Sequence, residues 1–388
     1  MLFLIKNADV YSPEPGGRCD LLIGGGKILR MEPDIRISRK YCDVIDARNL
    51  RALPGFIDGH VHIMGGGGEG GFATRTPDLP LTDAIYGGIT TVVGCLGTDG
   101  YTRNMAGLLA KAKGLDEEGL STFVYSGSYG VPLRTLMPSL EEDLLFIDKV
   151  IGAGEVALSD HRSSQPTFEA FAHVVATARR GGMLSGKAGI VNVHLGDGVR
   201  GLEFLRRIIA ETELSAHQML PTHINRNPRL FEEGIAYAKG GGFVDFTTST
   251  LASYLEDGEI PCAKALRRML EAGVDPGQIT FTSDGQGSLP DWDRHGRLQD
   301  ISVGRVLSLY QAVRQAVQDE GIPLETALRV ITSNPARILK LKAKGRLAVG
   351  MDADIVLVDP HELEVRTVMA KGRLLMKAGK LLAKGLFQ

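Results

Sequence analysis

The sequence predicts an α/β protein, a (β/α)8 TIM barrel that carries a small β-sandwich domain built from both chain termini. Two observations support this fold class. In the middle of the chain, apolar strand-like runs recur at intervals of roughly 25–35 residues with helical segments between them, which is typical of successive βα units. Toward both ends, short strands and tight turns replace that rhythm. We therefore predict a β-domain from residues 1–53 plus 344–388 and a metal-dependent hydrolase barrel over residues 54–343.

Eight apolar runs are predicted as the barrel strands, and helical patterns separate several of them. Ser139 and Glu142 form a capping box ahead of an apolar segment, which predicts a helix start. Apolar residues at three-to-four spacing predict helices over 168–180, 228–239 and 301–317. Eight βα units favour a TIM barrel, whose chemistry sits at the carboxyl ends of its strands. The predicted strands lie at 53–62, 89–97, 122–129, 156–162, 190–194, 219–226, 243–250 and 279–284.

An open doubly wound sheet is the alternative fold. That fold normally has a glycine-rich nucleotide-binding turn after its first strand. The glycine-rich run at 65–71 follows the first predicted strand, but it lacks the GK[ST] of a phosphate loop. We interpret it instead as a loop that carries a single carboxylate, Glu69.

The two ends of the chain are each too small to form a core alone. A hairpin is predicted over 21–29, with its turn in a run of three glycines. Near the other end, a strand over 353–359 precedes a second hairpin over 367–377, which turns at Lys371 and Gly372. Isolated strands are only marginally stable in water. The two ends are therefore expected to meet in one β-domain.

The bulk composition is that of an ordinary globular protein. Its 388 residues are 43% hydrophobic and 23% charged, with a formal net charge of −2. This near-neutral balance argues against nucleic-acid binding and against an anionic membrane partner, since both need a broad basic surface. We recognise no signal peptide, and no apolar run approaches the ~20 residues that span a bilayer. We expect a cytoplasmic protein.

The four cysteines, Cys19, Cys42, Cys95 and Cys262, are widely spaced and match no zinc-ribbon or CxxC pattern. We interpret them as reduced thiols, as expected in the cytosol. Cys95 is interpreted as a core residue, because free cysteine behaves as a small apolar side chain.

Histidines and carboxylates at the ends of the predicted strands suggest a metal site. His60 and His62 occupy alternate positions of one strand, so their side chains share a face about 6.5–7 Å apart along the backbone. His194, His223 and Asp284 lie at or near the carboxyl ends of later strands, where a barrel site forms. Four imidazoles and an aspartate exceed the needs of one tetrahedral zinc ion with an open position. Two metal ions fit this set better.

Two neighbouring cations need an anion between them, and Glu155 is the candidate bridge. It stands at the start of the fourth predicted strand, from where it can reach inward. The alternative is a solvated turn residue after Gly154. His161 directly follows the same strand, and we expect it to support the metal ligands from behind or to have no role. The ligand types suit zinc, cobalt or manganese.

Longer motifs carry a family resemblance. The sequences PGFIDGHVH (54–62) and GMDADIVLVD (350–359), together with the later single histidines and the final Asp284, resemble the amidohydrolase superfamily. Within that superfamily, the chain is similar to the isoaspartyl (β-aspartyl) dipeptidases over essentially its full length. The motifs of this closer similarity are GGGGEGGFATRTP (65–77), TTVVGCLGTDG (90–100), SGSYGVP (126–132), ALSDHRSSQP (157–166), THINRN (222–227) and TSDGQGS (282–288).

The resemblance implies roles for the metal ligands. His60, His62 and Asp284 would hold one zinc ion, and His194 and His223 the other. Many members of the superfamily bridge the two ions with a carboxylated lysine, where this sequence has Glu155. We expect two Zn²⁺ ions bridged by Glu155 and a hydroxide. Lys187 lies in a loop before the fifth predicted strand and is poorly placed to act as the bridge.

The resemblance also implies a small dipeptide substrate with a β-linked amide bond. Glu69 resembles the family residue that pairs with the substrate ammonium group. Arg162 and Arg226 suit the two substrate carboxylates, in either assignment. Thr98 and Ser288 are candidates for further hydrogen bonds.

The expected reaction is attack of the metal-bridging hydroxide on the side-chain amide carbonyl. Tyr129 would stabilise the oxyanion, and Asp284 would carry the proton to the departing amine. The resemblance further implies a homo-oligomer. Two alternatives remain: a related amidohydrolase that acts on a cyclic amide or an N-acyl-amino acid, and a non-catalytic barrel scaffold without metals, which the complete ligand set argues against.

Overall fold

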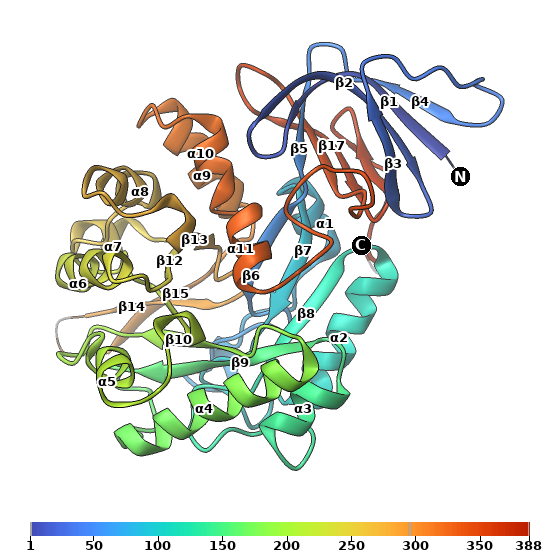
Figure 1. The fold of residues 1–388 in the computed structure, drawn as a ribbon. Coiled ribbons are helices and arrows are strands. Elements are labelled where there is room, and N and C mark those ends of the chain that lie inside the picture. The colour runs from blue at the N-terminus through green and yellow to red at the C-terminus, as the bar shows by residue number, and fades with distance from the viewer. Residues whose placement is uncertain (1, 294, 296, 387) are drawn as a thin grey trace.

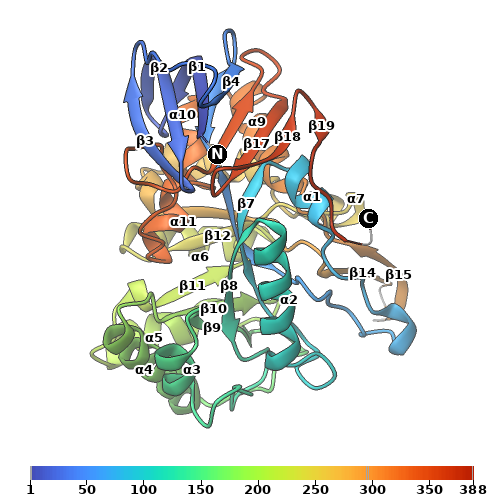
Figure 2. The ribbon, with the colours of Figure 1, turned by 90° about the vertical axis from the view of Figure 1, so that its right-hand side faces the viewer.

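The structure, a computed structural model, describes residues 2–293, 295, 297–386 and 388. Helices surround a set of parallel strands, and a sheet formed by the two ends of the chain lies beside them (Figure 1). The view turned by 90° shows this sheet at one end of the molecule, with blue N-terminal and red C-terminal strands together (Figure 2). The predicted fold class is confirmed. The predicted domain boundaries at residues 53/54 and 343/344 remain predictions.

Eight parallel strands form the barrel. Six of them pair in chain order from β6 to β11, and β12 pairs with β13. Single hydrogen bonds join the two groups: the Ile224 N–H donates to the Asp245 carbonyl (3.2 Å) and the His62 N–H to the Gly285 carbonyl (2.9 Å). All carboxyl ends therefore meet at one rim. The strands are β6 (Phe56–Val61), β7 (Ile89–Gly94), β8 (Ser121–Ser126), β9 (Val150–Leu158), β10 (Ile190–Leu195), β11 (Met219–Thr222), β12 (Val244–Thr247) and β13 (Ile279–Thr282).

Seven of the eight barrel strands are buried along their whole length, and in β8 only Phe123 is partly exposed. Parallel strands that are covered on both faces read as continuous apolar runs, which explains why the sequence pattern marks them. The outer layer packs directly on them: the rings of Phe56 in β6 and Tyr310 in α9 stack with centroids 4.4 Å apart. Several functional residues lie just after the strands, because β8, β9 and β11 end three or four residues earlier than predicted.

Helices cover the outside of the barrel (Figure 1). The Ser139 hydroxyl accepts a hydrogen bond from the Glu142 N–H and caps α3, as predicted, and helices are confirmed where 168–180 and 228–239 were expected. The helices are α1 (Leu81–Tyr86), α2 (Met105–Glu118), α3 (Leu140–Phe146), α4 (Phe168–Ser185), α5 (Glu203–Glu211), α6 (Pro228–Lys239), α7 (Ala252–Glu256), α8 (Cys262–Glu271), α9 (Ser308–Gln318), α10 (Leu324–Arg329) and α11 (Ser333–Ile338), with 3-10 turns at Phe72–Thr74, Ala216–Gln218 and Pro276–Gln278.

The helix predicted over 301–317 is wrong in its first turns. Residues 298–303 form strand β15 (Leu298–Val303), which pairs antiparallel with β14 (Ser288–Trp292). The helix α9 begins only at Ser308. The apolar residues at 301 and 303 alternate with polar ones, as in a strand. Over so few residues, this alternation cannot be distinguished from helical spacing.

The two chain ends form one nine-stranded sheet. N-terminal strand β5 pairs with C-terminal strand β16, which joins the two segments as expected. Both predicted hairpins are present, and the second turns at Lys371 and Gly372, which adopt positive φ values of 47° and 72°. The strands are β1 (Leu2–Tyr11), β2 (Pro15–Gly24), β3 (Lys27–Glu32), β4 (Asp43–Asp46), β5 (Arg51–Pro54), β16 (Ile355–Val358), β17 (Val365–Ala370), β18 (Arg373–Lys377) and β19 (Lys380–Leu381).

Across the described part of the chain, none of the helices combines the length and the apolar character that crossing a bilayer requires.

Candidate metal centre

The six predicted metal ligands converge at the carboxyl rim of the barrel. His60 lies in β6 with His62 just after it, and His194 lies in β10. His223 follows β11 and Asp284 follows β13. Glu155 lies inside β9. This strand begins at Val150, whereas it was predicted to begin at residue 156, just after Glu155. All six side chains are buried; the exposed fraction of Glu155 is 1%.

One group of ligand atoms gathers around the two histidines of the first strand. The His60 Nε2 lies 3.2 Å from Glu155 Oε2 and 3.6 Å from Asp284 Oδ1. The His62 Nε2 lies 3.4 Å from Glu155 Oε1 and 3.1 Å from Asp284 Oδ1. Atoms bound to one zinc ion at tetrahedral positions are about 3.4–3.6 Å apart. The spacing therefore fits a shared cation.

A second group lies on the other side of the same glutamate. The Glu155 Oε2 is 3.2 Å from His194 Nδ1 and 3.7 Å from His223 Nε2, and these two nitrogens are 2.9 Å apart. Both groups satisfy the spacing of a metal site, and Glu155 belongs to both. A carboxylate between two neighbouring ligand groups is the arrangement of a binuclear centre, as predicted.

Several buried polar atoms at the centre lack well-aligned hydrogen bonds. Among the described residues, four buried atoms make no well-aligned hydrogen bond, although oppositely charged groups lie near them: both ring nitrogens of His60, Glu155 Oε1 and Asp284 Oδ1. Buried polar atoms without partners are rare in proteins because leaving them unsatisfied is costly. A pair of divalent cations would satisfy these atoms, so the residues fit a metal centre.

Two ligands sit on unusual backbone. His223 and Asp284 adopt φ values of 64° and 52°, in the left-handed region that residues other than glycine rarely use. His223 directly follows β11, and Asp284 follows β13 after one intervening residue, so both turns lie at the carboxyl rim. Strained backbone of this kind clusters at functional sites.

Outer partners hold the imidazoles in place. The His223 Nδ1 lies 2.6 Å from the Thr247 hydroxyl, and the His194 Nε2 lies 2.9 Å from Asp160 Oδ2. Such contacts fix the ring orientation of metal-binding histidines. Sequence reasoning missed Thr247 and Asp160. Asp160 had a signal, because it stands beside His161 and Arg162 near the end of the predicted strand 156–162, whereas Thr247 had none.

The buried charges set the protonation states of the ligands. Burial alone raises the pKa of Glu155, but the charge of His60 and hydrogen bonds with neighbouring imidazoles hold that pKa well below its usual range. Burial also raises the pKa of Asp284, and the hydrogen bond and charge of His62 lower it more strongly. Burial and the charge of Arg226 lower the pKa of His223. Glu155 and Asp284 are thus ionised and His223 is neutral. Although burial lowers the pKa values of His60 and His62, neighbouring anions raise them more strongly, so metal binding would displace protons from these two imidazoles.

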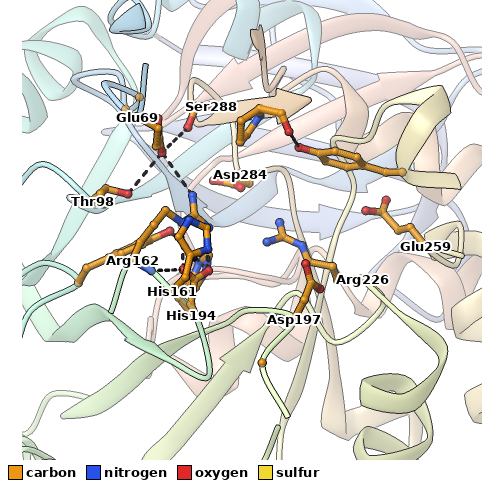
Figure 3. A pocket seen from close by; sticks show the side chains of 18 of the residues that line it. Glu69, Thr98, His161, Arg162, His194, Asp197, Arg226, Glu259, Asp284 and Ser288 are labelled. Carbon is orange, nitrogen blue, oxygen red and sulfur yellow. Dashed lines mark hydrogen bonds and ion pairs between the residues drawn. The ribbon is translucent and has the colours of Figure 1, made fainter. Parts of the chain in front are cut away.

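A cavity of about 660 Å³ opens over the ligands, and it is lined by all five predicted substrate-binding residues. Glu69 lies at the centre of one wall, where its Oε1 accepts from the Ser288 hydroxyl (2.9 Å) and the Thr98 hydroxyl (3.4 Å) and lies 3.3 Å from the Arg162 Nη1. Figure 3 shows this group facing Arg226 across the pocket.

The two arginines differ in their surroundings. Arg162 forms a two-point ion pair with Asp160, with distances of 3.0 Å (Nε to Oδ1) and 2.8 Å (Nη2 to Oδ2), in addition to its contact with Glu69. Arg226 points into the cavity beside Asp197 and Glu259 (Figure 3), and its guanidinium makes no hydrogen bond or ion pair with any residue that the structure describes. Arg226 therefore has the guanidinium that is available to a ligand.

Other residues singled out in the sequence lie around this centre. The Tyr129 hydroxyl is 2.9 Å from His194 Nδ1 at the edge of the cavity. His161 lines the cavity, but its side chain is 76% exposed and it is not among the ligand groups. Lys187 donates to the carbonyls of Leu144 and Ile147 and is not near the ligands, in agreement with its exclusion. Cys95 is buried, as expected of a core residue, but its thiol also belongs to the first ligand group.

The chain was compared with known proteins. In overall structure it is similar to the β-aspartyl dipeptidase of Fervidobacterium islandicum AW-1, crystallised with β-Asp-Leu, at 47% identity over 98% of both chains and a TM-score of 0.92. A D-hydantoinase at 20% identity and a TM-score of 0.70, covering 99% of this chain and 97% of that chain, shares the fold. In sequence, this chain is 26% identical to the 5-methylthioadenosine/S-adenosylhomocysteine deaminase of Carboxydothermus hydrogenoformans, over 93% of this chain and 85% of that protein.

A family model gives the broader classification. Residues 51–375 match the amidohydrolase family, which covers the barrel and strands of the terminal sheet. The match includes all six ligands of the buried histidine–carboxylate cluster. The chain therefore belongs to the amidohydrolase family.

Proposed function

We propose that the chain hydrolyses the β-linked amide bond of isoaspartyl dipeptides at a centre of two zinc ions. The observation that carries this proposal is the wall formed by Glu69, Arg162 and Ser288 beside the histidine–carboxylate cluster. It offers a carboxylate for a substrate ammonium group within the same cavity as the metal ligands. The similarity to a β-aspartyl dipeptidase at 47% identity supports the same substrate class.

His60, His62 and Asp284 would hold one zinc ion and His194 and His223 the other, with Glu155 shared between them. When bound, such a pair polarises a carbonyl group and lowers the pKa of bound water toward ~7, which provides a nucleophile at neutral pH. The contribution of the chain is to fix the positions of the ligands and to keep them from the solvent.

Glu69 binds the substrate ammonium group. Its Oε2 is buried and has no partner among the described residues, so one carboxylate oxygen is available for this contact. Thr98 and Ser288 hold the other oxygen in place. Arg226 binds a carboxylate of the substrate, because its guanidinium is unpaired in the described cavity, while Arg162 is committed to Asp160 and acts mainly by orienting Glu69.

Tyr129 and Asp284 handle the charge and the proton of the reaction. Burial raises the pKa of Tyr129 well above its usual value, so its hydroxyl stays protonated and can donate to the developing oxyanion. Asp284 is ionised, so its carboxylate can accept a proton and return it to the departing amine.

We also propose that the protein is a cytoplasmic homo-oligomer. The four cysteines are free thiols, in keeping with a reducing compartment. The resemblance to the isoaspartyl dipeptidases supports assembly of several copies.

The test combines metal content with a substrate panel. Purified protein should contain about two zinc ions per chain and should hydrolyse β-Asp-Leu, with no comparable turnover of α-Asp-Leu, hydantoins, dihydroorotate or N-acyl-amino acids. Turnover of a cyclic amide or an N-acyl-amino acid in place of β-Asp-Leu would assign the chain to another amidohydrolase activity. Absence of bound metal and of all these activities would leave only a scaffold.

A further inference from the structure

We propose that the Cys95 thiolate is a protein ligand of the metal position that His60 and His62 form. This inference rests on the proposed function for the presence of the metals, and it adds a sulfur ligand to a site otherwise built from nitrogen and oxygen. The three amino acids belong to one group with Glu155 whose ligand atoms all lie within 4.8 Å of one another.

The barrel fixes the position of Cys95. The residue directly follows β7, the neighbour of β6, and its backbone N–H donates to the Val61 carbonyl at a distance of 3.0 Å. That hydrogen bond aligns Cys95 with the residue between the two metal-binding histidines. The side chain has no exposed surface, and its Sγ lies 3.8 Å from the His62 Nδ1.

The spacing is that of ligands around one ion. Zinc–sulfur and zinc–nitrogen bonds of about 2.3 and 2.1 Å place tetrahedral ligand atoms about 3.6 Å apart. The ligand atoms of this group lie within 4.8 Å of one another, a wider spacing than this, so side-chain movements would be needed to close the group on a cation. Independent support comes from buried atoms without hydrogen-bond partners in this group: the ring nitrogens of His60, one of which can face the shared position, and the Oε1 of Glu155.

Charge balance favours the thiolate. Two divalent cations carry four positive charges, and the carboxylates of Glu155 and Asp284 together with a bridging hydroxide supply three negative ones. Excess charge in a buried site is costly. A Cys95 thiolate beside His60, His62 and Glu155 would supply the fourth negative charge. A thiolate is also a strong ligand for zinc and is deprotonated when it coordinates one.

The alternative is that the thiol only supports His62 through its Nδ1, as an outer partner. A spectroscopic experiment separates the two roles, because only a directly bound thiolate transfers charge to the metal. In the wild-type protein loaded with Co²⁺, we expect an intense near-ultraviolet thiolate-to-cobalt absorption band. Cys95→Ser should lose the band and bind the metal more than about 100-fold more weakly, beyond the 10–100-fold loss typical of an outer partner.

Cys42→Ser is the matched control. Cys42 is also buried, but it packs in the terminal sheet against Leu4, Leu22 and Ile35. This variant should keep both the band and the metal affinity. The wild-type spectrum alone is decisive if Cys95→Ser does not fold: a cobalt-loaded protein without the band overturns the proposal.

The outcome is independent of the substrate. A wild-type protein that hydrolyses β-Asp-Leu but shows no thiolate band keeps the proposed function and refutes the role of Cys95. A protein that shows the band and loses it in Cys95→Ser, yet hydrolyses no isoaspartyl dipeptide, confirms the ligand and refutes the function.

Discussion

Glu155 faces both groups of histidines from one carboxylate. Its Oε2 lies 3.2 Å from both His60 Nε2 and His194 Nδ1, and its Oε1 turns toward His62. A glutamate in this position needs no carboxylation to become an anion, so the site is complete in the sequence itself. If both groups bind metals as proposed, the shared carboxylate would make occupancy of the two positions interdependent.

Replacing this carboxylate tests that dependence. Glu155→Gln keeps the shape of the side chain but removes its charge, so we expect zinc content to fall from about two toward about one per chain and kcat for β-Asp-Leu to fall at least about 100-fold. Metal analysis and steady-state kinetics measure both. Glu211→Gln, at an exposed ion pair with Arg207, is the control. Two retained zinc ions with unchanged turnover would exclude Glu155 as the bridge.

Tyr129 provides a test of oxyanion stabilisation. Tyr129→Phe should lower kcat by about 10²–10³, the usual effect of losing one oxyanion donor, while zinc content stays unchanged. The control is Tyr237→Phe, because Tyr237 is a buried tyrosine whose hydroxyl contacts the Ala216 carbonyl away from the cavity. Intact kcat in Tyr129→Phe would remove the hydroxyl from the reaction.

Arg226 tests the assignment of the two arginines. Arg226→Gln should raise KM for β-Asp-Leu about 10- to 100-fold, because a charge-assisted hydrogen bond contributes about 1.5–3 kcal/mol. The exposed Arg206, which pairs with Glu233 outside the cavity, serves as the control when replaced by glutamine. An unchanged KM would transfer carboxylate binding to Arg162.

At the scale of elements, one buried carboxylate joins three barrel strands. Asp245 in β12 accepts hydrogen bonds from the hydroxyls of Thr222 in β11 (2.7 Å) and of Thr280 and Thr282 in β13 (both 2.6 Å). Burial raises the pKa of Asp245 from 3.8 to about 6, although the three threonine hydrogen bonds oppose the rise. Strands β11, β12 and β13 are thus linked by a carboxyl group whose pKa is about 6.

A raised carboxyl pKa makes stability depend on pH with a defined sign. The folded state holds this proton more tightly than the unfolded state, so the contribution of Asp245 is complete below its ordinary pKa and is lost as pH rises through about 6. Between about pH 4 and pH 7, wild type should lose about 2 kcal/mol of unfolding free energy relative to Asp245→Asn. Guanidinium unfolding at several pH values measures this difference. A constant difference across that range would contradict the shift.

Elements also show where sequence reasoning succeeds and where it stops. The ends of β6, β10 and β13 are predictable to within two residues, because each apolar run stops at a histidine or an aspartate. Strand β11 ends at Thr222, before its predicted end at residue 226. Strand β9 is harder, since Gly152 and Gly154 resemble a turn. The structure explains them: a Cβ at Gly152 would lie 2.4 Å from the Ile190 carbonyl oxygen, and one at Gly154 would lie 2.7 Å from that of Asn192. Close approach of β10, which no local pattern reveals, requires both glycines.

The outer partners of the site are hidden from the sequence for a related reason. Thr247 contacts His223 from a neighbouring strand, and Asp160 reaches His194 across another strand pair. Neither spacing repeats a local motif. The ligands are predictable because metal chemistry accepts few residue types, whereas the groups that orient them can be any polar side chain that the fold brings close.

At the scale of the whole molecule, a buried lysine connects the terminal sheet to the barrel. The Lys344 Nζ lies 2.5 Å from Asp354 Oδ2, 2.8 Å from Asp352 Oδ2 and 2.6 Å from the Ser121 hydroxyl of β8. Asp354 also accepts from the Lys371 N–H in the C-terminal hairpin. The attachment of the sheet therefore depends on paired charges as well as on apolar packing.

Lys344→Met should destabilise the protein by about 3–5 kcal/mol, because it leaves a buried aspartate without its cation. Lys27→Met is the matched control: Lys27 also pairs with Asp352, at 2.6 Å, but its side chain is 44% exposed, and surface pairs contribute less than about 1 kcal/mol. Chemical unfolding of the three proteins gives the comparison. Equal losses in both variants would argue against a structural role for the buried lysine.

The contacts from Glu69 through Arg162 and Asp160 to His194 have a consequence for how occupancy is regulated. These contacts connect Glu69, the proposed partner of the substrate ammonium group, with His194, a proposed ligand of the second metal position. Thermodynamic linkage requires reciprocity between two such positions. If bound metal changes the affinity of Glu69 for an aminoacyl inhibitor by some factor, the inhibitor must change the metal affinity by the same factor. An inhibitor that binds more tightly to the metal-loaded protein would therefore slow removal of the metal by chelators.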